Sequence, residues 1–171
     1  MTKCLARCLT LPRAAQLLLA ASLGSLAFVL VMQFGFGLEP CVLCLWQRVP
    51  YDAAAIIAAI LWAWKPYARH SVVLLILLTA IYLTGMGLAV FHTGVEQHWW
   101  VGTPGCAVQP LNGTSPDDLR RQLLQMTVPH CDHIAWTFLG LSMANWNIVW
   151  SLFLAFFAAA TAAKVAEPPK G

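Results

Sequence analysis

The chain has 171 residues, of which 60% are hydrophobic and only 10% are charged, and its mean hydropathy is +0.70. This composition excludes an ordinary soluble domain, because such domains carry about 25% charged residues. The formal net charge of +3 is small and is explained by the charge asymmetry of a membrane protein, so it does not indicate nucleic-acid binding.

Four apolar segments approach the roughly 20 residues that a helix needs to cross a bilayer. The expected spans are residues 14–34, 49–65, 71–91 and 146–163. We therefore predict an all-α membrane protein, a four-helix transmembrane bundle that forms a single integral membrane domain over the whole chain.

The first span could alternatively be the apolar core of a cleaved signal peptide, because basic residues precede it. Its apolar run is longer than the roughly 7 to 15 residues of such a core. We therefore expect the first helix to be retained.

Lysine and arginine are unevenly distributed between the two sides that this topology creates. Most of them lie on the side of the two termini, whereas Arg48, Arg120 and Arg121 lie on the other. Because positively charged segments stay in the cytoplasm, we expect both termini to be cytoplasmic. The loops 35–48 and 92–145 are then extracytoplasmic.

The second loop contains the pattern of a short amphipathic helix at residues 115–126. Ser115 can cap its N-terminus, Pro116 suits the first helical position and Asp118 the third. Apolar residues follow at helical spacing. Packing against the protein and lying in the membrane interface are both open for this helix.

Four cysteines fall in these loops as two pairs on one side of the membrane. Cys41 and Cys44 form a C-x-x-C pair in the first loop, and Cys106 and Cys131 lie in the second. Disulfides persist on an extracytoplasmic side, and the very small C-x-x-C ring suits redox chemistry better than stapling. Alone, Cys106 and Cys131 could form a structural staple worth roughly 3 to 4 kcal/mol. Together the pairs predict thiol-disulfide exchange.

Arg48 is the only basic residue near the first pair. If one continuous helix covered this segment, the Arg48 guanidinium would lie over Cys44 and favour the thiolate. Pro50 instead favours a new helix that begins at about Val49, which would leave Cys44 and Arg48 in a turn. At that depth Arg48 can also stabilise negative charge on the oxygens of a membrane quinone, or it can contact lipid phosphates. His92, at the end of the third span, could supply protons.

The remaining polar and sulfur groups do not predict a metal site. His130 and His133 flank Cys131, but this run lacks the spacing of a zinc knuckle. Cys4 and Cys8 precede the first span and supply too few ligands for zinc. We expect no metal, and we interpret Cys4 and Cys8 as incidental.

The ordered set of motifs resembles the DsbB family of bacterial disulfide bond formation proteins over essentially the whole chain. The set consists of Cys41-x-x-Cys44 followed by Gln47-Arg48, His92-Thr93 after the third span, and Cys131 followed by Trp136 and Phe138-Leu139-Gly140-Leu141. A C-x-x-C pair alone is a weak signal, whereas this order of motifs is specific.

The resemblance implies a quinone-dependent protein dithiol oxidase in the bacterial inner membrane. A DsbA-like periplasmic thioredoxin-fold protein would attack the loop disulfide at Cys106 and release Cys131. Exchange with Cys41 and Cys44 would re-form the loop disulfide, and Cys44 would pass two electrons to ubiquinone or menaquinone. The residues expected to bind the quinone are Arg48, Gln47 and His92.

Two alternative functions remain open. A quinone reductase similar to vitamin K epoxide reductase also joins a C-x-x-C pair to a quinone-like ligand, but we expect that pair late in its helix bundle. The other alternative is a non-catalytic membrane electron carrier, or an assembly protein, in which disulfides are staples.

Overall fold

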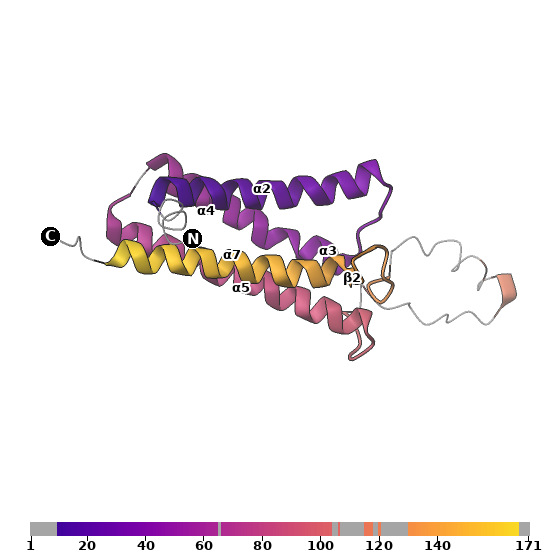
Figure 1. The fold of residues 1–171 in the computed structure, drawn as a ribbon. Helices are drawn as coiled ribbons and strands as arrows, with labels where there is room; N and C mark the ends of the chain where they lie inside the picture. The colour runs from indigo at the N-terminus through magenta and orange to yellow at the C-terminus, as the bar shows by residue number, and fades with distance from the viewer. Residues whose placement is uncertain are drawn as a thin grey trace.

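The structure, a computed structural model, describes residues 10–64, 66–103, 106, 115–117, 120 and 130–167. Helices dominate these residues, and one small antiparallel β-hairpin accompanies them (Figure 1). The elements are α2 (Leu11–Gly35), α3 (Val42–Trp46), α4 (Arg48–Trp64), α5 (Ala68–Glu96), β1 (Thr137–Phe138), β2 (Leu141–Ser142) and α7 (Met143–Ala166).

Three of the described helices are long and apolar enough to cross a membrane. They are α2 with 25 residues, α5 with 29 and α7 with 24. Helix α4 has 17 residues, slightly fewer than the roughly 20 that a perpendicular span requires. The all-α membrane class is therefore confirmed, and the number of four spans stays a prediction.

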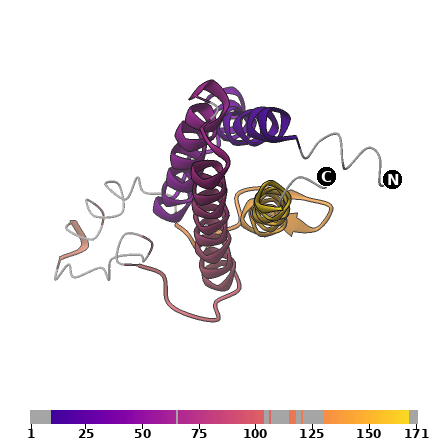
Figure 2. The ribbon, with the colours of Figure 1, turned by 90° about the vertical axis from the view of Figure 1, so that its left-hand side faces the viewer.

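The long helices pack in pairs, with α2 against α4 and α5 against α7, and α4 also contacts α5 (Figures 1 and 2). Alanines form much of the contact surface of α4 and α7, which lets the helix backbones approach closely. The buried core consists of Ala15, Leu18, Tyr51, Ala54, Ala58, Leu61, Leu75, Leu78, Tyr82, Leu154, Ala155, Ala158 and Ala162.

Polar side chains inside the bundle bind one another across helices. Ser22 on α2 lies 2.8 Å from the hydroxyl of Tyr82 on α5, and the hydroxyl of Tyr51 on α4 donates to Asn147 Oδ1 on α7 at 2.5 Å. In lipid no water is present to satisfy such groups. These bonds therefore fix which helix faces meet.

Helices α5 and α7 extend beyond the predicted spans at one end of the bundle, which we call the cysteine end because Cys41, Cys44, Cys106 and Cys131 lie there. Helix α5 continues to Glu96 and α7 begins at Met143. His92 consequently lies inside a helix, one turn before Glu96. The sequence had suggested that the second loop begins at His92.

Two hydrogen bonds join α5 to the start of α7 at this end. Ser142 is the N-cap of α7: its hydroxyl oxygen accepts from the backbone N–H of Asn145 at 3.2 Å, and its hydroxyl donates to Glu96 Oε2 at 2.5 Å. Thr93 donates to the Asn145 side-chain oxygen at 2.9 Å. The cap of one helix is thereby bonded to the last turn of the other.

A two-residue turn connects β1 and β2 just before α7. Its central residues, Leu139 and Gly140, have φ angles of 52° and 78°, as the common hairpin turns with two positive φ angles require. The indole N–H of Trp146 donates to the carbonyl of Phe138 at 3.0 Å. The predicted amphipathic helix at residues 115–126 lies largely outside the described residues.

Gly94 allows the chain to fold back over the end of α5. The ring of Trp100 lies where a Cβ on Gly94 would be. That indole stacks on Phe91 at a centroid distance of 5.9 Å, and its Nε1 donates to the Phe91 carbonyl at 2.9 Å. A side chain at Gly94 would therefore displace Trp100.

We predict that Gly94→Ala destabilises the protein by about 1–3 kcal/mol, the usual effect of inserting atoms into a packed contact. Gly87→Ala, also in α5, is the matched control, because nothing lies within 4 Å of its Cβ position. It should be neutral or slightly stabilising. Thermal unfolding in detergent, followed by circular dichroism, measures both. Equal melting temperatures for the two variants would contradict the packing described here.

Candidate functional site

Cys41 and Cys44 occupy the first turn of the short helix α3. Cys41 is the N-cap residue, with an extended backbone (φ −72°, ψ 169°). Its sulfur accepts a hydrogen bond from the backbone N–H of Cys44 at 3.2 Å, and the two sulfurs lie 2.8 Å apart as free thiols. The C-x-x-C spacing thus places one sulfur at the cap and the other on the third helical residue, in direct contact.

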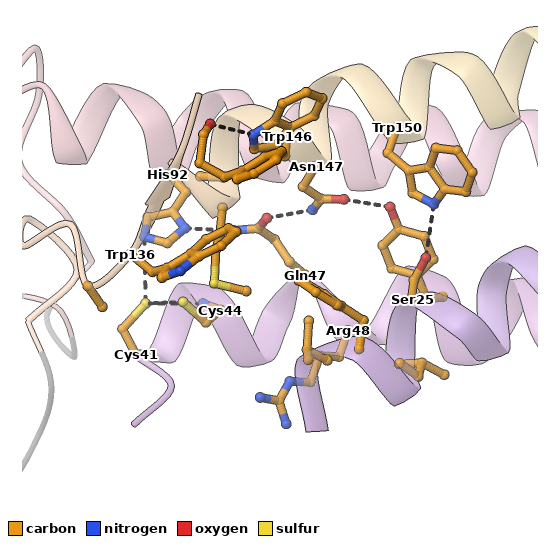
Figure 3. A pocket seen from close by; sticks show the side chains of 18 of the residues that line it. Ser25, Cys41, Cys44, Gln47, Arg48, His92, Trp136, Trp146, Asn147 and Trp150 are labelled. Atoms are coloured by element: carbon orange, nitrogen blue, oxygen red, sulfur yellow. Dashed lines mark hydrogen bonds between the residues drawn. The ribbon is translucent and has the colours of Figure 1, made fainter. Parts of the chain in front are cut away.

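His92 brings an imidazole to this pair from α5 (Figure 3). Its Nε2 lies 3.6 Å from Cys41 Sγ, and the side chain is buried. Glu96, one helical turn later, has its Oε1 3.9 Å from the same nitrogen. A thiol, an imidazole and a carboxylate therefore meet in a buried site.

The two thiols have opposite electrostatic surroundings. The hydrogen bond from the Cys44 thiol, then the contact with His92 and the Cys44 backbone N–H, outweigh burial and hold the pKa of Cys41 well below its usual range. The same hydrogen bond, burial and the charge on Cys41 raise the pKa of Cys44. Since the thiolate is the reactive form, Cys41 carries the nucleophilic character in this arrangement.

Arg48 follows a break in the helix. Helix α3 ends at Trp46, Gln47 forms a turn, and α4 begins at Arg48. Pro50 accounts for the break, because a proline nitrogen cannot donate to the carbonyl four residues earlier. A break before Pro50 was one of the two arrangements considered for this segment, but the expectation that Cys44 and Arg48 both lie in a turn is wrong: Cys44 is in α3 and Arg48 is the first residue of α4. No hydrogen bond joins Arg48 to Cys44 in Figure 3, and His92 is the polar side chain at the sulfurs.

A cavity of about 1040 Å³ lies beside the cysteine pair, between α2, α4 and α7. Small-molecule sites are commonly cavities of roughly this size, with apolar walls and a few polar groups. Here the polar groups include Cys44, Gln47, Arg48 and His92, while α2 contributes mostly apolar residues. The indole N–H of Trp150 on α7 donates to Ser25 on α2 at 2.9 Å, along the wall of the cavity.

The Nε of Arg48 is buried in this wall and has no hydrogen-bond partner among the described residues. An unsatisfied buried donor costs about 1–3 kcal/mol. An acceptor oxygen on a ligand in the cavity would satisfy it. The apolar walls and this donor therefore fit a membrane quinone, which has a flat apolar ring with carbonyl oxygens.

The second cysteine pair forms a disulfide between Cys106 and Cys131, with a Cα–Cα distance of 5.0 Å. It is buried in one cluster with Cys41, Leu43 and Val95. The structure thus brings together the four cysteines that the sequence placed on one side of the membrane. Cys106 is only 4% exposed and Cys131 is fully buried.

Two polar residues that the sequence did not identify as functional belong to this site. Glu96 lies beside His92, and Asn147 on α7 donates through its Nδ2 to Gln47 Oε1 at 2.5 Å. Gln47 in turn lies 2.7 Å from His92 Nδ1 through its Nε2. Two features of the sequence could have identified them as site residues. Glu96 follows His92 at a spacing of four residues, and Asn147 is a polar side chain inside an apolar helix.

The sulfurs of Cys41 and Cys44 and a ring nitrogen of His92 lie within 4.8 Å of one another, as metal ligands would. These are three donors, fewer than the four protein ligands of a structural zinc site. His130 and His133, which the sequence weighed as metal ligands, line the cavity instead.

Residues 12–161 match the family model described as "Disulfide bond formation protein DsbB". Curated relatives carry the name Disulfide bond formation protein B. The protein of Xylella fastidiosa (strain Temecula1) is 37% identical over 138 residues, which is 77% of this chain and 78% of that protein. The protein of Xanthomonas axonopodis pv. citri is 35% identical over 143 residues, covering 81% and 82%.

A third relative, from Aromatoleum aromaticum, is 30% identical over 142 residues, or 82% of this chain and 86% of that protein. No solved structure matches the chain significantly. The family match spans the helices that form the cavity and both cysteine pairs, so the resemblance seen in the motifs is confirmed. The chain belongs to the DsbB family of disulfide bond formation proteins.

Proposed function

We propose that this protein is a quinone-dependent protein dithiol oxidase of a bacterial inner membrane. It takes two electrons from a reduced periplasmic thioredoxin-fold protein of the DsbA type and passes them to ubiquinone or menaquinone. The main support is the position of both cysteine pairs in one cluster beside a large apolar cavity. Both termini are cytoplasmic in this proposal, so the cysteine end faces the compartment where disulfides persist.

The loop disulfide receives the electrons first. A thiolate of the partner attacks Cys106, the bond to Cys131 breaks, and Cys131 leaves as a thiolate. Cys131 then attacks Cys41 in a Cys41–Cys44 disulfide and releases Cys44. The common burial of Cys41 and Cys131 supports this choice of sulfur.

Resolution of these mixed disulfides re-forms the loop pair. The second thiol of the partner closes its own disulfide and frees Cys106, which attacks Cys131 and displaces Cys41. A thiol of low pKa leaves readily in such exchanges, and the surroundings lower the pKa of Cys41. The state with Cys106–Cys131 bonded and Cys41 and Cys44 reduced corresponds to the structure described here.

The last step returns Cys41 and Cys44 to a disulfide. A bound quinone supplies an acceptor for two electrons and two protons. The Cys41 thiolate forms the S–S bond with Cys44, and the pair gives up two electrons and the Cys44 proton. The second proton comes from the solvent, which took up the proton that Cys41 released on ionising. Arg48, Gln47 and His92 line the cavity that would hold the quinone.

Turnover should be measurable with purified protein under anaerobic conditions. Incubation with a reduced thioredoxin-fold dithiol protein and a short-chain quinone should lower the quinone absorbance. Cys44→Ser and Cys106→Ser should each abolish this reaction. When dithiothreitol replaces the protein donor, Cys106→Ser should again reduce the quinone, because a small dithiol can reduce the Cys41–Cys44 pair directly.

Cys4→Ser is the matched control for these replacements and should turn over as the unmodified protein does. If Cys106→Ser retains the initial rate with the protein partner, the assigned entry point is wrong. If the unmodified protein reduces the quinone neither with the thioredoxin-fold dithiol protein nor with dithiothreitol, the proposed function is wrong.

Arg48→Met should weaken quinone use without unfolding the protein. Loss of a charge-assisted hydrogen bond of about 1.5–3 kcal/mol corresponds to a rise of roughly 10- to 100-fold in the KM for quinone. Arg69→Met, an exposed arginine at the start of α5, is the control. Steady-state kinetics at varied quinone concentration measure both. An unchanged KM in Arg48→Met would remove Arg48 from the quinone site.

The reactivity of Cys41 should persist as the pH is lowered. A free thiol has a pKa of about 8.5 and loses its thiolate below that pH, whereas the surroundings lower the pKa of Cys41. Cys41 is largely buried, so its alkylation by iodoacetamide in reduced protein is limited by access, but the rate, followed by mass spectrometry, should change little between pH 8 and pH 6. Cys44→Ala removes the main hydrogen bond and should move the loss of reactivity to higher pH. Loss near pH 8 in the unmodified protein would contradict a Cys41 thiolate.

A further inference from the structure

A chain of hydrogen bonds runs from His92 into the bundle (Figure 3). Gln47 Nε2 lies 2.7 Å from His92 Nδ1, and Asn147 Nδ2 donates to Gln47 Oε1 at 2.5 Å. The hydroxyls of Tyr51 and Ser151 donate to Asn147 Oδ1 at 2.5 Å and 3.1 Å. Helices α4, α5 and α7 and the turn before α4 all contribute to this chain.

The chain has a consistent direction from donors to acceptors. The Asn147 oxygen accepts from the two hydroxyls, and its amide nitrogen faces Gln47. Gln47 accepts there with its oxygen and therefore turns its own amide nitrogen to His92. A ring nitrogen that accepts a hydrogen bond carries no proton. Nδ1 of His92 is thus unprotonated, and the proton of the neutral ring sits on Nε2.

Nε2 is the nitrogen that faces the redox pair, 3.6 Å from Cys41 Sγ. We infer that Gln47 and Asn147 are positioning residues that hold neutral His92 as the Nε2–H tautomer, so that its ring donates to the Cys41 sulfur. The inference deepens the proposed function and rests on it for the role of Cys41. In the opposite tautomer Nε2 would accept from the Cys41 thiol, and the thiolate would lose this donor.

Burial makes the direction of the chain matter. Gln47 and His92 are 8% and 4% exposed, and Tyr51 and Ser151 are also buried. Water therefore has little access to satisfy a group that faces the wrong way, and turning one amide would set donors against donors. Reversing His92 requires both amides to turn together.

The other titratable groups around His92 are compatible with this assignment. Glu96 on α5 has Oε1 3.9 Å from Nε2, farther than the Cys41 sulfur, and its second oxygen already accepts from Ser142. A carboxylate beside Nε2 also favours a proton on that nitrogen. Gln47 presents an uncharged amide to Nδ1, and the backbone of Cys131, also uncharged, interacts with the ring.

The tautomer can be read directly by nuclear magnetic resonance. Full-length protein labelled with ¹⁵N-histidine, reduced anaerobically in nanodiscs at a pH above the titration of His92, where the ring is neutral, should show His92 Nδ1 with an unprotonated-type shift and Nε2 with a protonated-type shift. The His92→Phe variant identifies the signals. This measurement requires no turnover, so it can fail or succeed independently of quinone reduction. A protonated Nδ1 in the unmodified protein would overturn the inference.

Two replacements of Asn147 test the direction of the chain. Asn147→Leu removes the donor to Gln47 and should give a mixture of tautomers. Asn147→Asp presents only acceptors, so the Gln47 nitrogen should turn toward it and Nδ1 of His92 should gain a proton. Thr161→Val, also on α7, is the matched control, because it loses a hydrogen bond to the Phe157 carbonyl without touching Gln47, and the His92 ring signals should be unchanged in it.

Circular dichroism confirms folding. If Asn147→Asp does not fold, Asn147→Leu decides alone. Unchanged His92 signals in folded Asn147→Leu would overturn the inference, even if the protein reduces quinone as proposed.

Discussion

The bonded junction between the last turn of α5 and the first turn of α7 is the constraint on which the site depends. Ser142 caps α7 and at the same time donates to Glu96, while Thr93 binds Asn145. His92 lies one residue before Thr93 in the same turn, so these bonds fix the position of its ring. Without them, neither the distance from His92 to Cys41 nor the contact between Gln47 and Asn147 would be defined.

The contacts at the cysteine end produce two unlike sulfurs from a symmetric C-x-x-C motif. Cys41, at the N-cap, contacts the Cys44 thiol, receives a hydrogen bond from the Cys44 backbone N–H and approaches His92, which lowers its pKa, whereas the pKa of Cys44 is raised. A pair with one good leaving group and one protonated partner suits a relay that accepts electrons on one side and releases them on the other. The adjacent cavity provides the space for an apolar acceptor.

Much of the architecture could be predicted from the sequence because apolar spans and cysteine spacing are strong local signals. The membrane class and the common side of Cys41 and Cys106 followed from them. The exact ends of the helices did not, because apolar residues stop before the helical hydrogen bonds do. Helix α5 therefore includes His92 and Glu96, which sequence reasoning had placed in a loop.

The polar contacts within the site were the least predictable part. Pairing of Asn147 with Gln47 depends on how α7 is rotated about its axis, and no local pattern encodes that rotation. Arg48 is a similar case: four-residue spacing suggested a contact with Cys44, and Pro50 favoured a break. Only the three-dimensional arrangement shows that the break prevails and that His92 lies beside the sulfurs.

The burial of the loop disulfide has a consequence for selectivity. With Cys106 4% exposed and Cys131 fully enclosed, small thiols that diffuse past the membrane surface have almost no access to this disulfide. A protein that inserts its own residues around Cys106 can uncover the bond by replacing the contacts that enclose it. Shielding of this kind discriminates between reductants of the loop disulfide by shape rather than by redox potential.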